Sequence, residues 1–193
     1  MRTTLLTRLF LAARLAGFVT AYAVLYVVLF ELNGVLFRDL QHMEGVHWVY
    51  LPAGVRLCLV LVAPVPGALG VMLGSLWIGI TGTPQDGWSV AAVTAALSGG
   101  APLLAREMAL RGLGLSAQLE ELQSQSLLLL AGLFGATSAL LHQVWYAAIG
   151  RPGPFFDHVV AMAVGDFLGA VLLLYAARLL LGRLGFNRPD RDA

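Results

Sequence analysis

Lysine is absent from this chain of 193 residues, and cysteine is nearly so. All 12 basic residues are arginine, and the one cysteine, Cys58, excludes a disulfide within the chain. Without lysine there is no P-loop lysine, and the sequence also lacks C-x-x-C, H-E-x-x-H and G-x-S-x-G motifs. These absences exclude the enzyme classes that depend on such motifs. We expect a protein that is not an enzyme, with no catalytic residue, no metal site and no cofactor.

Charged residues are also scarce in this sequence. Charged residues make up 12% of the chain, against about 25% in a typical soluble domain. Hydrophobic residues reach 59%, and the mean hydropathy is +0.80. So little charge cannot cover the surface of a soluble globule of this size, and a net charge of +1 provides no field that attracts nucleic acid. We therefore predict an all-α, polytopic membrane helix bundle, a single integral-membrane domain over residues 1–193, with the lipid bilayer around it and no nucleic-acid partner.

Six membrane segments are expected in this bundle. Four stretches reach roughly the 20 apolar residues that cross a ~30 Å hydrocarbon core, namely 9–32, 88–106, 126–148 and 158–182. The uncharged stretch between Arg56 and Asp86 is different, because Pro64-Val-Pro66-Gly67 interrupts its middle and proline breaks helices. The sequence thus predicts two short arms, 51–63 and 67–81, joined by a Pro-rich turn. They form either two short crossings or one hairpin that enters from one side.

Arginine and tryptophan residues orient these segments. Cytoplasmic flanks of membrane helices carry an excess of basic residues, and Trp is enriched at the membrane boundaries. With both termini in the cytoplasm, eight arginines lie at inner ends and only Arg38 and Arg151 lie in outer loops. All four tryptophans then lie at outer ends, beside outer loops at 33–50, 82–88 and 149–157. We predict a multi-pass protein of the inner (plasma) membrane, with a first helix that is retained rather than cleaved as a signal peptide.

The predicted cytoplasmic loop at 107–125 has a pattern of its own. Apolar residues at 115, 119 and 122 have the i, i+4, i+7 spacing of an amphipathic helix. Such a helix lies at the lipid headgroups or, alternatively, offers a docking face to a partner protein.

Four ionisable residues lie in the outer half of four different predicted membrane segments and form our candidate site: Glu31, Arg56, His142 and Asp166. Ionisable groups are costly at this depth, and they usually face the bundle interior and mark a functional site. Counted from the predicted helix ends, the four come from different segments and lie in the outer half, so we expect them to converge. An Arg56–Asp166 ion pair is the least costly arrangement. Two interpretations stay open: a structural pair that fixes helix register, or a small outward-facing pocket in which the four residues bind an unknown small ligand.

Glycine pairs predict close packing within the bundle. Gly70 and Gly74 form one G-x-x-x-G motif, and Gly165 and Gly169 form another. Small residues at this spacing let helix backbones approach closely in lipid. We expect both motifs to pack helices within the chain, with a dimer face as the alternative.

Three stretches carry a family resemblance: Trp48-Val-Tyr-Leu-Pro52-Ala-Gly54-Val-Arg56-Leu, Pro66-Gly67-Ala-Leu-Gly70-Val-Met-Leu-Gly74-Ser and Val164-Gly165-Asp166-Phe-Leu-Gly169. They resemble segments of the bacterial membrane-associated sensor (MASE-type) domains, which are integral-membrane input modules of diguanylate cyclases and histidine kinases. The resemblance implies a sensory role and makes Arg56 and Asp166 positions to test. The chain departs from the family in having fewer helices and no cyclase, kinase or phosphodiesterase motif. Its output would then depend on a cytoplasmic or membrane signalling partner.

We therefore expect a non-catalytic, sensor-like membrane module that binds a small ligand in its outer half. The alternatives are a small-solute transporter, or the substrate-binding subunit of one, and a purely structural or assembly protein. Transport requires a polar route into the cytoplasmic half. The polar residues of the predicted segments lie in the outer half, which favours sensing or structure.

Overall fold

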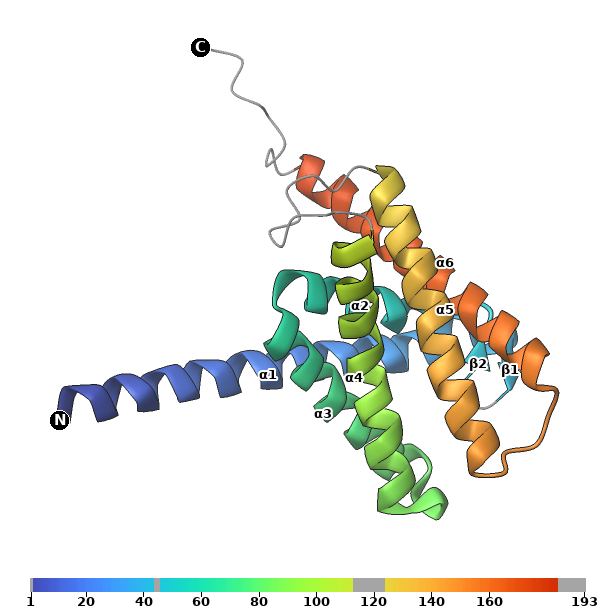
Figure 1. The fold of residues 1–193 in the computed structure, drawn as a ribbon, viewed down its shortest axis with the longest axis horizontal. Coiled ribbons are helices and arrows are strands. Elements are labelled where there is room, and N and C mark those ends of the chain that lie inside the picture. Colours follow the sequence, from blue (N-terminus) through green and yellow to red (C-terminus); the bar gives the residue numbers. More distant parts are fainter. Residues whose placement is uncertain (1, 44–45, 113–123, 184–193) are drawn as a thin grey trace, which may run out of the picture.

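The chain is a bundle of six α-helices in a computed structural model that describes residues 2–43, 46–112 and 124–183 (Figure 1). The helices are α1 (Arg2–Leu36), α2 (Leu51–Val62), α3 (Pro64–Gly82), α4 (Gly87–Gly112), α5 (Ser124–Ala148) and α6 (Phe155–Arg183). The connections include two 3-10 turns, η1 (Arg38–Leu40) and η2 (Pro84–Asp86), and a small antiparallel pair of strands, β1 (Gln41–Met43) and β2 (Val46–His47). The predicted all-α bundle is confirmed. The amphipathic helix predicted at 115–122 lies outside the described residues.

Five helices in the described ranges are long and apolar enough to cross a membrane, which makes this a multi-pass membrane protein: α1, α3, α4, α5 and α6. The sixth, α2, is apolar but has only 12 residues and is about 18 Å long. The prediction of six membrane segments is therefore matched by five helices of spanning length and one short helix. Of the two arms predicted to be short, α3 is instead a helix of 19 residues.

The chain reverses at Ala63, one residue before the first of the two prolines. Ala63 has φ −141° and ψ 84°, which ends α2. Pro64 and Pro66 lie in the first turn of α3, where a helix does not need their missing N–H groups. A Cβ at Gly67 would overlap the Leu59 carbonyl, so this glycine lets α3 pack directly against α2. The predicted hairpin is confirmed, and α3 gains length because it begins at the prolines rather than after them.

The short helix α2 lies at the centre of the bundle and contacts all five other helices. Its Ala53 and Leu57 belong to a fully buried apolar cluster with residues of α4, α5 and α6: Ala101, Ala105, Ala109, Leu130, Ala131, Phe134 and Ala170. We call this cluster the apolar core.

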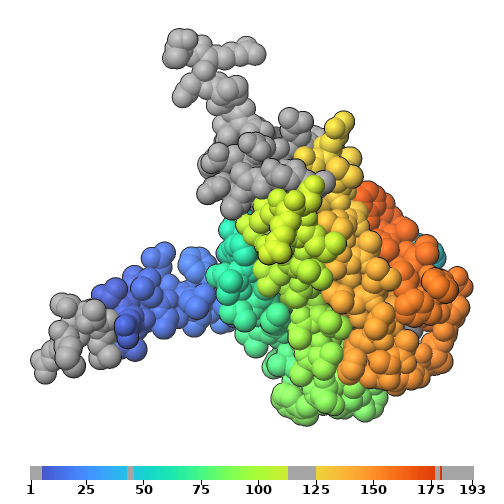
Figure 2. All heavy atoms as spheres, in the orientation of Figure 1, coloured from blue at the N-terminus to red at the C-terminus, as the bar shows by residue number. Residues whose placement is uncertain are grey.

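Helix α1 joins the bundle only through its C-terminal half. There it packs on α3, where Gly70 and Gly74 lie against Tyr22, Ala23 and Tyr26. The N-terminal half projects away from the other helices (Figures 1 and 2). The candidate membrane span of α1, Leu6–Leu36, has 31 residues and is about 46 Å long. This Gly70–Gly74 motif packs helices within the chain, as predicted.

Residues 46–50, which we call the inner arm, run into the bundle beside α6 instead of staying outside it. The Tyr50 N–H donates a hydrogen bond to the Gly165 carbonyl, at 3.1 Å. Gly165 lies ten residues after Phe155, about 15 Å along α6. A Cβ at Gly165 or Gly169 would overlap the carbonyl oxygen of His47 or of Tyr50, respectively. The Gly165–Gly169 motif thus packs within the chain, as predicted. Gly165 lies against the extended backbone of the inner arm, and Gly169 lies against Tyr50 and the first turn of α2.

Candidate functional site

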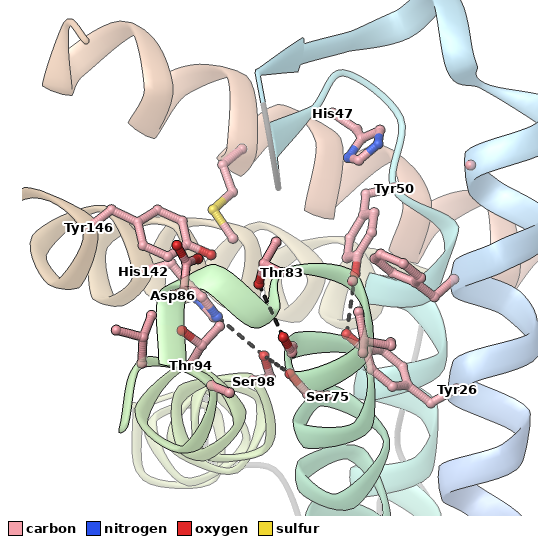
Figure 3. A pocket seen from close by; sticks show the side chains of 18 of the residues that line it. Tyr26, His47, Tyr50, Ser75, Thr83, Asp86, Thr94, Ser98, His142 and Tyr146 are labelled. Atoms are coloured by element: carbon pink, nitrogen blue, oxygen red, sulfur yellow. Dashed lines mark hydrogen bonds between the residues drawn. The ribbon is translucent and has the colours of Figure 1, made fainter. Parts of the chain in front are cut away.

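A cavity of about 340 Å³ lies at the end of the bundle where α3 meets α4 and α5 meets α6. This size is at the lower end of the range for pockets that bind small molecules. All six helices, the inner arm and η2 contribute to its lining, with α1 presenting Tyr26, Phe30 and Gly34 at intervals of four residues. The cavity reaches from a partly exposed rim at Asp86 and Arg151 to a floor of buried polar side chains (Figure 3).

Arg56 of α2 forms the centre of this floor and is 1% exposed. Its Nε donates a hydrogen bond to the Ser98 carbonyl of α4, and its Nη2 donates one to the Ser138 hydroxyl of α5, both at 3.0 Å. The guanidinium also lies over the Phe134 ring, with 5.2 Å between its central carbon and the ring centroid. One cation from the short helix therefore joins α4 and α5 at the bottom of the cavity.

Asp166 of α6 supplies the counter-charge, so the predicted Arg56–Asp166 ion pair is present. Arg56 Nη1 lies 3.7 Å from Asp166 Oδ2, and Asp166 is 1% exposed. This distance is within the range of an ion pair but too long for a hydrogen bond. The Oδ2 atom of Asp166 has no hydrogen-bond partner. Asp166 is not among the residues that line the cavity and lies behind Arg56.

His142 of α5 belongs to the same floor and orders a short chain of hydroxyl groups. Its Nδ1 is 2.8 Å from the Ser138 carbonyl, which can only accept, so Nδ1 carries a proton. Its Nε2 is 3.3 Å from the Ser98 hydroxyl, which in turn receives a hydrogen bond from the Ser75 hydroxyl at 3.0 Å (Figure 3). An uncharged His142 ring that accepts from Ser98 satisfies all three contacts. Arg56 and His142 thus converge as predicted, through Ser98 and Ser138.

Aromatic side chains form the walls above this floor. The hydroxyl groups of Tyr26 and Tyr50 are 3.2 Å apart and face each other on one side of the cavity (Figure 3). Tyr146 lies on the opposite side, and the His47 ring stacks on Tyr50 with 5.6 Å between centroids. Burial lowers the pKa of His47, whose Nδ1 has no hydrogen-bond partner. The walls therefore combine apolar ring faces with a few hydroxyl groups.

An ion pair crosses the rim. Arg151, in the connection between α5 and α6, donates to Asp86 of η2 at 2.5 Å. Its guanidinium also lies over the Tyr146 ring, 4.4 Å from the centroid. Both partners of the pair are partly exposed, at 21% and 29%. This contact fastens the α3–α4 connection to the α5–α6 connection at the mouth of the cavity.

Glu31 lies apart from the other three predicted site residues. It is exposed on α1 and does not line the cavity, so the predicted convergence of all four residues does not hold. Successive residues of a helix are about 100° apart, and Asn33, two positions on, faces inward instead. Asn33 is buried, and its Oδ1 accepts the N–H of Leu51, the first residue of α2. Asn33 thus caps α2 from another helix.

Besides the rim pair of Asp86 and Arg151, sequence reasoning missed several uncharged polar groups of the site: Tyr26, Tyr50, Ser75, Thr94, Ser98 and Ser138. A search for ionisable residues passes over hydroxyl side chains, which are common in membrane helices. Two of them could have been found from their positions in the sequence. Ser98 and Ser138 lie in the middle of apolar segments, where a hydroxyl group needs a hydrogen-bond partner.

Comparison of the chain with protein-family models, with curated proteins and with solved structures finds no match. The function therefore has to be argued from the cavity and its surroundings.

Proposed function

We propose that this chain is a sensory input module of the bacterial inner membrane that binds a small ligand in the cavity above Arg56. In this proposal both termini are cytoplasmic, the cavity opens to the outer side, and the module has no catalytic activity. Its output passes to a cytoplasmic or membrane signalling partner. The observation that carries the proposal is a cavity with a polar floor that every helix helps to build.

The inner arm supports a water-accessible cavity. Non-helical backbone inside a membrane is tolerated only where it is buried in protein or lines a water-filled cavity. The arm and the half-length helix α2 form such an interruption, and His47, Tyr50 and Arg56 of this segment line the cavity. In membrane transporters, interrupted helices of this kind indicate the binding site.

The apolar core favours binding over transport. It lies between the cavity floor and the opposite end of the bundle, and its members are alanines, leucines and a phenylalanine that are almost completely buried. A solute that crossed the bundle would have to pass this region without a polar contact. A transporter, or its substrate-binding subunit, remains the alternative function, and it requires the core to open.

The orientation rests on the two ends of the bundle. The ends of α4 and α6 away from the cavity carry Arg106, Arg111 and Arg183, and α1 begins with Arg2 and Arg8. Because basic residues mark the cytoplasmic side, the cavity end faces outward. The motif resemblance to membrane-associated sensor domains supports the sensory role, and two of its three stretches supply Arg56 and Asp166.

One-sided thiol labelling tests this proposal. In a Cys58→Ala background, Thr94→Cys places a single thiol on the cavity wall, and Val93→Cys places the control thiol on the exposed, lipid-facing side of the same helix turn. A charged, membrane-impermeant thiosulfonate is added to either side of oriented vesicles. We expect the thiol at 94 to react only from the outer side and the thiol at 93 to react from neither.

The labelling outcomes separate the functions. Reaction of the thiol at 94 from both sides would favour the transporter. No reaction from either side would exclude an accessible pocket and with it the proposed function.

A further inference from the structure

The charges around the cavity are balanced, and this balance bears on what the cavity binds. Three charged side chains contribute to the described lining: Arg56, Asp86 and Arg151. Asp86 and Arg151 neutralise each other at the rim, and Asp166 neutralises Arg56 from behind. The Arg56–Asp166 pair is almost completely buried, so a charged ligand at the floor would leave one net charge in a region of low dielectric constant. An uncharged ligand would leave none.

The polar groups at the floor also bear on the chemistry of the ligand. Arg56 lines the cavity and can only donate, whereas the neighbouring hydroxyl groups of Ser75 and Ser98 can donate and accept. Asp166 does not line the cavity, so a ligand meets its charge only through Arg56. Hydroxyl and amide groups can pair with both kinds of floor group, whereas a carboxylate can only accept and an ammonium can only donate.

From these two observations we infer that the cavity binds a small, uncharged molecule that carries hydroxyl or amide groups, and that Asp166 is the residue that excludes anions. This inference rests on the proposed ligand-binding function and adds the chemical class of the ligand. The aromatic walls and the cavity volume suit a molecule with one ring or a short chain, whose apolar faces lie against Tyr26 and Tyr146. Asp166 acts through Arg56, and we therefore describe it as a positioning and charge-balancing residue.

Three probes of one shape test the inference. Benzamide, benzoate and benzamidine share a benzene ring and a planar three-heavy-atom substituent, and at neutral pH they are neutral, anionic and cationic. Their binding to the purified full-length protein in detergent micelles is measured by thermal shift and by competition. In the wild type we expect benzamide to bind at least about tenfold more tightly than either ion, a difference of about 1.4 kcal/mol in binding free energy.

Two charge variants should change this preference in opposite directions. Asp166→Asn leaves the Arg56 cation unbalanced, so benzoate should become the preferred probe. Arg56→Gln leaves the Asp166 carboxylate unbalanced, so benzamidine should become the preferred probe. Asp157→Asn removes the same charge from the exposed first turn of α6 and should leave the preference for benzamide unchanged. A merely structural pair would reduce the binding of all three probes without reversing their order.

Blocking the cavity separates a failure of this inference from a failure of the proposed function. Gly34 lines the cavity with open space around its Cα, and Gly17 has the same open space on the projecting half of α1. Gly34→Leu should abolish probe binding, and Gly17→Leu should not. If both leave benzamide binding intact, the probe binds elsewhere and the proposed pocket is wrong. If Gly34→Leu abolishes binding but the wild type prefers benzoate, the pocket stands and the uncharged ligand is wrong.

The charge variants can decide the matter even if the wild type binds no probe. Binding of benzoate to Asp166→Asn, or of benzamidine to Arg56→Gln, supports the inference, because the remaining charge is then uncompensated next to the cavity. Absence of binding in the wild type and in both variants overturns it. If one variant does not fold, the other still supplies this comparison.

Discussion

Substitutions in the buried ion pair of Arg56 and Asp166 should reduce stability far more than substitutions in an exposed ion pair whose charged atoms are closer together. Removing one partner of a buried ion pair leaves an uncompensated charge, which destabilises by about 3–5 kcal/mol. We expect each of Arg56→Gln and Asp166→Asn to lower the free energy of unfolding by about this amount. Arg56→Gln should lie at the upper end, because it also removes the hydrogen bonds to Ser98 and Ser138.

The double variant is the decisive measurement. It removes both charges and leaves no isolated ion, so it should be more stable than either single variant. The sum of the two single effects should then exceed the double effect by at least about 2 kcal/mol, within the range measured for residues in direct contact. Unfolding of the purified protein from mixed micelles by added dodecyl sulfate, followed by tryptophan fluorescence, gives these free energies.

Glu107 and Arg111 on α4 provide the matched control. Their ion pair is shorter, at 2.7 Å, but both side chains are exposed. We expect Glu107→Gln and Arg111→Gln to cost no more than about 0.5 kcal/mol each, since exposed i,i+4 pairs contribute little. If the exposed pair proved as important as the buried one, or if the two buried substitutions were simply additive, the reasoning from burial would be wrong.

Three further outcomes follow from the packing around the inner arm. Gly169→Ala should destabilise the protein by more than about 2 kcal/mol in the same unfolding assay, because the new Cβ would overlap the Tyr50 carbonyl. The control, Gly132→Ala, has open space around the new Cβ and should be neutral or slightly stabilising. Asn33→Ala should cost about 1 kcal/mol through loss of the cap on α2, measured as a lower unfolding midpoint. Burial lowers the pKa of His47 in the folded state, so the protein should be most stable above the ordinary histidine value near 6.5 and lose stability as the pH drops below it. If the unfolding midpoint of His47→Gln had the same pH dependence as that of the wild type, this assignment would be wrong.

The helix break at the prolines and the Arg56–Asp166 pair could be predicted from the sequence, because the alternative arrangement of each would cost a large amount of free energy. A single proline is tolerated inside α4, at Pro102, but two prolines and a glycine within four residues favour a helix break. Neither Arg56 nor Asp166 can remain alone among apolar residues without a large cost. The sequence indicates less clearly which face of a helix is turned toward the bundle interior. Since α1 is apolar on all sides, nothing in its pattern distinguishes the face of Glu31 from that of Asn33.

The inner arm could not be predicted, for a different physical reason. Gly165 and Gly169 show that something approaches α6 closely, but a glycine pair accommodates a helix or an extended chain equally well. The choice depends on where residues 37–50 run, and that is decided by contacts with distant parts of the chain, such as the hydrogen bond from Tyr50 to Gly165. The depth of Tyr50 and the short length of α2 both follow from it.

The length of α1 has a mechanical consequence. The stretch of α1 from Leu6 to Leu36 is about 46 Å long and exceeds a hydrocarbon core of ~30 Å, so α1 either tilts or extends beyond the core. Bilayer thickness affects this balance, because a thicker membrane covers more of the helix at a given tilt. Because Tyr26, Phe30 and Gly34 of α1 form one wall of the cavity, a change in the tilt of α1 would move this wall relative to the other walls. We therefore expect bilayer thickness to influence the shape of the cavity.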